Sequence, residues 1–163
     1  MTNKILSEVK DGIGWIIYNN PARRNAVSLA MAEKVTEVVS EHNNNDDVRV
    51  VVVRGEGGKS FVAGQDISEF KELRSTPEGI ERYERITNGM YDGIRDCPKP
   101  VIAEVNGIAT AAGCQLVASC DLAVSSNSAK FATPGVNIGL FCSTPMVALS
   151  RNVSKKDSMK MLL

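Results

Sequence analysis

The sequence has little that would mark a protein that binds nucleic acid, spans a membrane or holds a metal. Its 163 residues carry 19 basic and 19 acidic side chains, and a chain without net charge has no long-range field to attract a phosphate backbone. No apolar run approaches the ~20 residues of a membrane-spanning helix. A single histidine and four cysteines without C-x-x-C spacing do not supply a zinc site. We therefore expect no nucleic acid, membrane or metal as partner.

Nucleotide-binding motifs and targeting segments are also missing. No predicted strand is followed by G-x-G-x-x-G or G-x-x-x-x-G-K-[ST], so the sequence supports neither a dinucleotide-binding site nor a P-loop. Residues 1–8 have neither the apolar core of a signal peptide nor the Arg-rich character of a transit peptide, so we expect a cytoplasmic protein.

His42 stands at the end of a predicted helix, where we expect it to be solvated.

The apolar pattern predicts strands that alternate with helices, which is typical of an α/β fold. Ser28 and Asp66 precede two of the predicted helices as caps. A third helix is predicted over residues 78–95, before two prolines, and the chain turns helical again from Ser143. The predicted strands cover residues 5–9, 14–19, 48–53, 101–105 and 121–124.

Two segments place small residues between a strand and a helix, at residues 59–70 and 106–121. Small residues let a ligand approach the backbone closely, and the unpaired N–H groups of a helix start attract an anion or a developing oxyanion. Each segment alone is equally typical of a tightly packed turn. Asp66 with Glu69 is a capping-box-like pair, so Asp66 is expected to be an N-cap rather than a catalytic acid. Together, the two segments predict a paired oxyanion hole.

Four segments resemble, in order, the signatures of the crotonase (enoyl-CoA hydratase/isomerase) superfamily: residues 19–26 (N-x-P-x-x-x-N-A), 61–67 (A-G-x-D), 106–121 and 131–140. The A-A-G-C-Q and T-P-G-V-N forms are similar to those of the enoyl-CoA hydratase domain-containing branch. The resemblance implies a spiral of β-β-α turns forming one domain over residues 1–163. Because family members continue into further helices, it implies a domain truncated at its C-terminal end, and a homotrimer or dimer of trimers for the complete protein.

The resemblance also assigns a site for an acyl-CoA substrate, with no cofactor beyond the coenzyme A of that substrate. The backbone N–H groups of Gln65 and Ala112 match the family's oxyanion hole. Arg23 and Arg24 match a phosphate-binding position, although two solvated loop arginines fit the sequence equally well. The positions carried over as substrate-binding are Arg24, Ala26, Ala63, Gln65, Asp66, Ile67, Ile108, Ala112, Gly113, Pro134 and Gly139.

The sequence departs from the family at the two acid/base positions, where hydratases carry glutamates. Gln115 and Gly135 stand there instead, and hydration needs one group to activate water and one to manage the α-proton. Two hypotheses stay open: an enoyl-CoA hydratase/isomerase-type enzyme of fatty-acid or other acyl-CoA metabolism, and a catalytically silent acyl-CoA-binding or regulatory protein. The side chains considered as substitutes, each expected to be structural, are Glu69, Glu104, Thr133, Cys142, Ser143 and Thr144.

Overall fold

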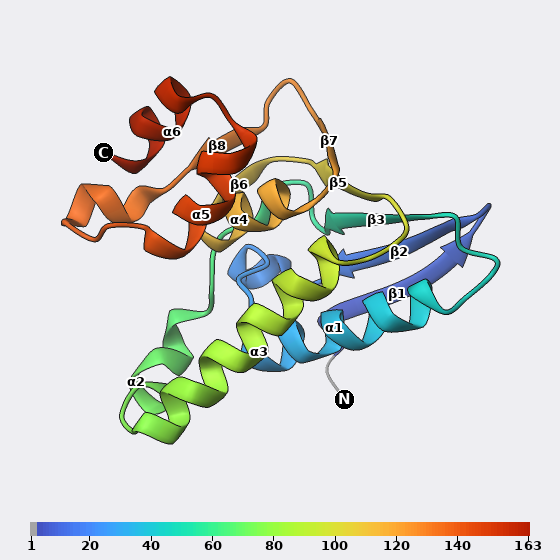
Figure 1. Cartoon of the computed structure of the whole chain (residues 1–163), viewed down its shortest axis with the longest axis horizontal. Coiled ribbons are helices and arrows are strands. Elements are labelled where there is room, and N and C mark those ends of the chain that lie inside the picture. Colours follow the sequence, from blue (N-terminus) through green and yellow to red (C-terminus); the bar gives the residue numbers. More distant parts are fainter. Residues whose placement is uncertain (1–2) are drawn as a thin grey trace.

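The computed structural model describes residues 3–163. The chain opens with an antiparallel hairpin of β1 (Ile5–Lys10) and β2 (Ile13–Tyr18), which turns at Asp11 and Gly12. Both turn residues have positive φ, 54° and 82°, as a two-residue hairpin loop of the Asp-Gly type requires. The two strands expected over residues 5–9 and 14–19 are therefore confirmed, and their hairpin forms one edge of the larger sheet (Figure 1).

Three β-β-α turns follow the hairpin and the first helix, α1 (Leu29–Asn43). Each turn sends its first strand to the five-stranded sheet β1-β2-β3-β5-β7 and its second to the three-stranded sheet β4-β6-β8. All of these strands pair in parallel apart from β1 with β2. The expected spiral of β-β-α turns is confirmed. Its elements are β3 (Val50–Gly55), β4 (Ser60–Val62), α2 (Phe70–Leu73), α3 (Pro77–Arg95), β5 (Val101–Val105), β6 (Ile108–Thr110), α4 (Ala112–Ser119), β7 (Leu122–Ser125), β8 (Lys130–Ala132), α5 (Ser143–Asn152) and α6 (Lys155–Leu162).

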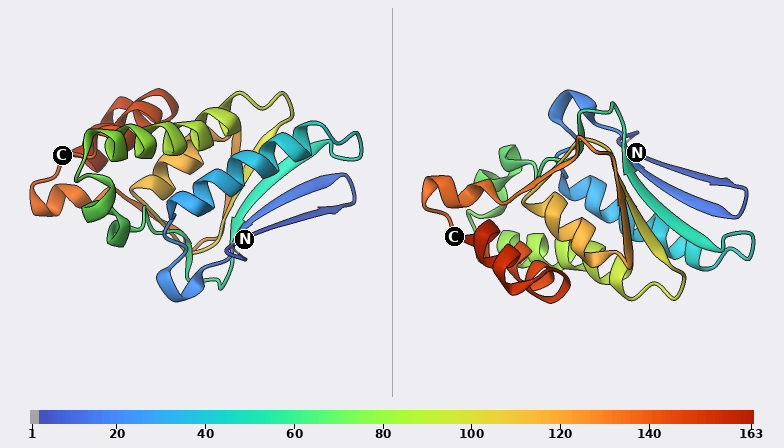
Figure 2. Two further views of the ribbon diagram at one scale, coloured as in Figure 1. Left: turned by 90° about the horizontal axis from the view of Figure 1, so that it is seen from below. Right: turned by 90° about the horizontal axis from the view of Figure 1, so that it is seen from above.

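The core lies between the five-stranded sheet and the two helices α1 and α3, which lie along one face of the sheet (Figure 2). Alternate residues of the strands point toward these helices, and Val51, Val53 and Val101 are completely buried there. On α1, Val35 and Val38 are equally buried, as the helical spacing of its apolar residues predicts. No helix among residues 3–163 is long and apolar enough to cross a bilayer.

The expectation that His42 is solvated is wrong. Its side chain is buried, and its Nε2 atom lies 3.2 Å from the carbonyl oxygen of Trp15. The hairpin folds over the end of α1, and Gly14 leaves the room, because a Cβ atom there would lie 2.7 Å from the imidazole ring. Lys99 Nζ also bonds the carbonyl of His42, at 2.7 Å, which fixes the end of the helix.

Candidate active site

The two small-residue junctions are neighbours because β4 and β6 pair in parallel. Parallel strands bring their carboxyl ends to one edge of a sheet. At this edge, a Cβ atom on Gly64 would lie 3.6 Å from that of Ala111. Helix α4 begins directly against β4, and a Cβ atom on Gly113 would lie only 2.0 Å from the Val62 carbonyl oxygen. Glycine is therefore required at position 113 for the two backbones to approach.

The backbone N–H groups of Gln65 and Ala112 have no hydrogen-bond acceptor within residues 3–163. The residues on either side of Gln65 both bond to Val27. The Val27 N–H donates to the Gly64 carbonyl at 2.9 Å, and the Val27 carbonyl accepts from the Asp66 N–H at 2.8 Å. Ala112 is the first residue of α4, so its N–H precedes the helical ladder. Both groups predicted as oxyanion-hole donors are thus unpaired, and they belong to adjacent junctions.

Ala111, which leads into α4, has a backbone conformation that residues with a Cβ atom rarely adopt: φ is 49° and ψ is −111°. Such a conformation costs on the order of 1–3 kcal/mol and persists where surrounding contacts determine it. Here Ala111 donates to the Ala132 carbonyl at 3.0 Å, and its own carbonyl accepts from Gln115 at 3.1 Å. The strained residue lies immediately before one of the two unpaired donors.

Asp66 is an N-cap, as expected, but its partners differ from those of a capping box. It accepts from the backbone N–H of Ser68 at 3.1 Å and from the Ser68 hydroxyl at 2.6 Å. The bond from this hydroxyl, together with the nearby Arg23 guanidinium, lowers the pKa of the carboxyl. Glu69 turns away and caps α1 instead, accepting from the Leu29 N–H at 2.9 Å.

The two arginines, which the sequence analysis gave the same role, have different surroundings in the structure. Arg23 Nη1 lies 3.1 Å from both carboxylate oxygens of Asp66 and 3.2 Å from the Ser68 hydroxyl. Arg24, by contrast, is exposed, and its guanidinium has no partner within the described chain. Of the two arginines, Arg24 is therefore the one whose whole guanidinium is free to meet a ligand.

Sequence reasoning missed the role of Asn25, which is completely buried beside these arginines. Its Oδ1 accepts from the Asn20 N–H at 2.8 Å, and its Nδ2 donates to the carbonyls of Glu56 at 3.0 Å and Ser60 at 2.9 Å. The side chain thereby joins the first loop to the turn between β3 and β4. The residue type was a signal in the sequence for a left-handed position in this loop, because asparagine adopts that conformation more readily than most residues, and Asn25 has a φ of 57°.

Several of the other positions predicted to bind substrate directly follow β4, β6 or β8 in the chain, whereas Ile108 stands at the opposite, amino end of β6. The Ala63 N–H donates to the Arg24 carbonyl at 3.1 Å, which ties the first loop to the end of β4. The pairing of Thr110 with Ala132 brings the carboxyl end of β8 next to that of β6. Predicted positions lie on the first loop and the β4 segment (Arg24, Ala26, Ala63, Gln65, Asp66, Ile67), on β6 and α4 (Ile108, Ala112, Gly113) and at the two ends of the short helix after β8 (Pro134, Gly139).

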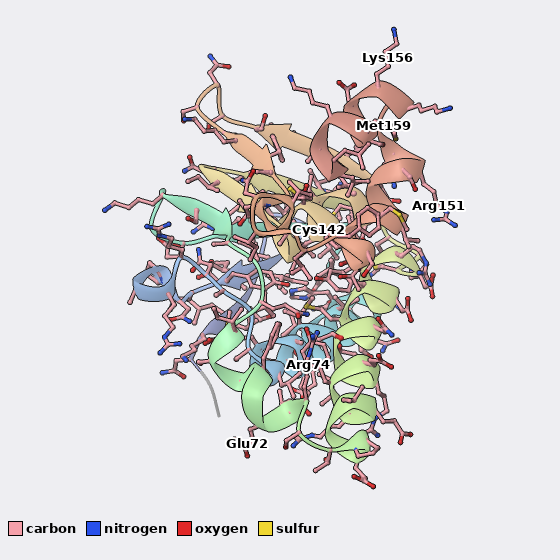
Figure 3. All side chains as sticks on the ribbon, turned by 90° about the vertical axis from the view of Figure 1, so that its left-hand side faces the viewer. Glu72, Arg74, Cys142, Arg151, Lys156 and Met159 are labelled. Carbon is pink, nitrogen blue, oxygen red and sulfur yellow. The ribbon has the colours of Figure 1, made fainter. Side chains whose placement is uncertain are left out.

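The two acid/base positions carry no acid or base, and one of them has no room for a side chain. Gln115 is half-buried on α4, and its amide has no partner within residues 3–163. A Cβ atom on Gly135 would lie 2.8 Å from Cys142 Sγ and 3.0 Å from the Leu140 carbonyl oxygen. Cys142, buried at the start of α5 (Figure 3), therefore occupies the space that a glutamate at position 135 would need.

Three of the six side chains considered as substitutes for the glutamates are engaged in structural contacts. Glu69 caps α1, and the buried Thr133 hydroxyl donates to the Met161 carbonyl. Glu104 alternates along β5 with the buried Ala103 and Val105, so it faces away from the helices. The thiol of Cys142 points to the Thr133 carbonyl at 3.8 Å. Two exposed hydroxyls in the first turn of α5 are left, those of Ser143 and Thr144.

The chain is similar to known proteins over nearly all of its length. The family model described as enoyl-CoA hydratase/isomerase matches residues 8–163. The chain is 48% identical to enoyl-CoA hydratase domain-containing protein 3, mitochondrial, of Danio rerio, over 97% of this chain and 54% of that protein. It is 34% identical to the short-chain-enoyl-CoA hydratase of Clostridium acetobutylicum, over 98% of this chain and 59% of that protein.

A solved structure shares the fold. The crystal structure of human enoyl-CoA hydratase domain-containing protein 3 superposes with a TM-score of 0.90 at 43% identity, covering 98% of this chain and 62% of that one. The chain spans about half the length of the curated vertebrate relatives it matches, at 54% for the Danio rerio protein and 50% for the human one.

The cytoplasmic location expected from the sequence is contradicted, because the vertebrate relatives that are 46–48% identical are named mitochondrial. The expectation rested on residues 1–8, which carry no information on this point in a chain that matches only part of those relatives. By sequence and by fold, the chain belongs to the enoyl-CoA hydratase/isomerase family.

Proposed function

We propose that the chain binds an acyl-CoA thioester and holds its carbonyl oxygen between the backbone N–H groups of Gln65 and Ala112. The observation that carries this proposal is the pair of unpaired donors at adjacent strand–helix junctions. The start of α4 adds the positive end of its dipole. Such donors stabilise the enolate that forms when the thioester loses an α-proton, and losing one typically costs about 3–4 kcal/mol of transition-state stabilisation.

We propose that the protein acts in acyl-CoA metabolism and, following the names of the vertebrate relatives, in mitochondria. Residues 1–163 make up one domain of the family in this proposal. A second candidate function, a catalytically silent acyl-CoA-binding or regulatory protein, is favoured by Gly135, since Cys142 fills the space of the missing carboxylate. The two candidates share the binding site and differ only in turnover.

Arg24 provides the test of binding. A guanidinium without a protein partner forms charge-assisted bonds to the phosphates of coenzyme A, so Arg24→Ala is expected to weaken butyryl-CoA binding about tenfold, a loss near 1.4 kcal/mol. Binding of butyryl-pantetheine, which lacks the nucleotide, should not change. Titration calorimetry measures both.

Arg49 serves as the matched control, because it lies before β3, at the end of the strands opposite the two junctions. Arg49→Ala should leave both affinities unaltered. If the wild-type chain binds no CoA thioester at millimolar concentration, the proposed function is wrong. Equal losses in the Arg24 and Arg49 variants would show a non-specific charge effect instead.

We propose further that the complete protein assembles as a homotrimer or a dimer of trimers, and we expect the 163-residue chain to self-associate. Every residue of the edge strand β7 is exposed, including Leu122 at 60% and Val124 at 63%. Beside it, an apolar hollow of about 360 Å³ is lined by Leu122, Phe131 and Met161. At the C-terminal helix, Met159 and Leu163 are exposed as well, whereas Leu162 is buried against α5.

Light scattering coupled to sizing checks this expectation. An unpaired edge strand with exposed apolar residues is a template for pairing with another chain. Val124→Lys, which places a charge on that edge, should therefore reduce the apparent mass. A wild-type chain that elutes as a monodisperse monomer would contradict the expectation.

A further inference from the structure

One hydrogen bond reaches the α4 junction from a distant part of the chain. Tyr91, on α3, donates its hydroxyl to the Ala112 carbonyl at 3.3 Å. Both residues are buried, and burial raises the pKa of the Tyr91 phenol well above its usual value. The hydroxyl is thus protonated at physiological pH and available as a donor.

This bond fixes the peptide group next to the one that carries the Ala112 N–H. The peptide group that carries the Ala112 N–H is itself held by the Gln115 N–H on the Ala111 carbonyl, at 3.1 Å, and the peptide group before it by the Ala111 N–H on the Ala132 carbonyl, at 3.0 Å. Gly113 is pressed against the Val62 carbonyl on the other side. Because the strained Ala111 has no favourable conformation of its own here, these outside contacts decide the direction of the Ala112 N–H.

We propose that Tyr91 is a positioning residue for the thioester carbonyl. Its hydroxyl holds the Ala112 carbonyl and so keeps the adjacent Ala112 N–H directed at the oxygen that the site binds. Tyr91 itself touches no substrate. The inference rests on the proposed oxyanion hole and adds to it a link between α3 and the direction of one donor.

Tyr18 supplies a matched control. It is also completely buried, and its hydroxyl donates to Met90 Sδ at 3.4 Å rather than to the junction. Met90 is the neighbour of Tyr91 in α3. Replacing either tyrosine by phenylalanine removes one buried hydroxyl from the same region, but only Tyr91→Phe removes a contact with Ala112.

The experiment compares wild type, Tyr91→Phe and Tyr18→Phe with two ligands. One is coenzyme A, which has no acyl carbonyl, and the other is a chromophoric cinnamoyl thioester of coenzyme A, whose absorption moves to the red when its carbonyl is polarised. Tyr91→Phe should bind coenzyme A as wild type does. It should bind the thioester about threefold to tenfold more weakly, the range expected for one hydrogen bond, and show less than half of the red shift. Tyr18→Phe should match wild type with both ligands.

Each other outcome overturns the inference. A full red shift and unchanged thioester affinity in Tyr91→Phe would show that the hydroxyl does not direct the donor. Loss of coenzyme A binding, together with an altered circular dichroism spectrum, would show that it supports the whole fold instead. If wild type binds coenzyme A but leaves the chromophore unshifted, or binds neither ligand, the oxyanion-hole proposal itself fails, independently of Tyr91.

Discussion

Hydration of crotonyl-CoA is expected to rise by several orders of magnitude when glutamates replace Gln115 and Gly135 and Cys142 is shortened to alanine in the same chain. Each general acid/base group typically contributes 10²–10⁴-fold to rate. The alanine is needed because a Cβ atom on residue 135 lies 2.8 Å from the Cys142 sulfur. Loss of the enoyl-thioester absorbance gives the rate directly.

Two controls separate chemistry from packing. Gln115→Glu with Gly135→Glu, but with Cys142 retained, should be less stable and gain less activity than the triple variant. Cys142→Ala alone should stay as slow as wild type. The two glutamates act on one reaction, so their effects need not multiply. Ordinary hydratase turnover in wild type, abolished by Gln115→Ala, would refute this interpretation, because it would make the amide part of a working site.

Gly113→Ala is expected to destabilise the protein by about 3 kcal/mol or more and to abolish thioester binding. The added Cβ atom would lie 2.0 Å from the Val62 carbonyl oxygen, which is backbone and cannot rotate away. Overpacking a tight contact typically costs 1–3 kcal/mol, and occasionally more. To make room, α4 must move off β4, and the Ala112 N–H moves with it. Urea denaturation measures the free energy of unfolding.

Gly89→Ala is the matched control, because a Cβ atom on this residue of α3 meets nothing within 4 Å. The same substitution should stabilise the protein there by up to about 1 kcal/mol, the difference in helix propensity between alanine and glycine. If Gly113→Ala is as stable as wild type and still binds the thioester, the close approach of α4 to β4 is not required.

The sequence predicted the long elements better than the short ones, for a physical reason. Apolar residues such as Val35 and Val38 recur with helical spacing, and Val51 and Val53 lie in a continuous apolar run. The strands β4, β6 and β8 have only three residues each, too few to show alternation. They were therefore read as parts of turns or left unassigned, although they place both junctions side by side.

Pairings between distant residues were similarly out of reach. The sequence placed Arg23 and Arg24 in one binding role, whereas the bond from Arg23 to Asp66 joins residues 43 positions apart. The burial of His42 beneath the hairpin depends on Gly14 and Trp15, which no local pattern connects to it. The small-residue junctions were recognised because their composition alone carries the signal.

The contact between Gly135 and Cys142 also sets an order of mutational steps. A lone Gly135→Glu change meets the Cys142 sulfur and the Leu140 carbonyl, so it costs stability before any catalytic gain is available. A prior change at Cys142 to a smaller residue removes the nearer of these two contacts and so lowers the cost of the same step. The effect of Gly135→Glu therefore depends on the residue at position 142, which is epistasis between the two sites. Cys142 takes no part in the chemistry, but it influences whether a two-glutamate hydratase can evolve from this sequence.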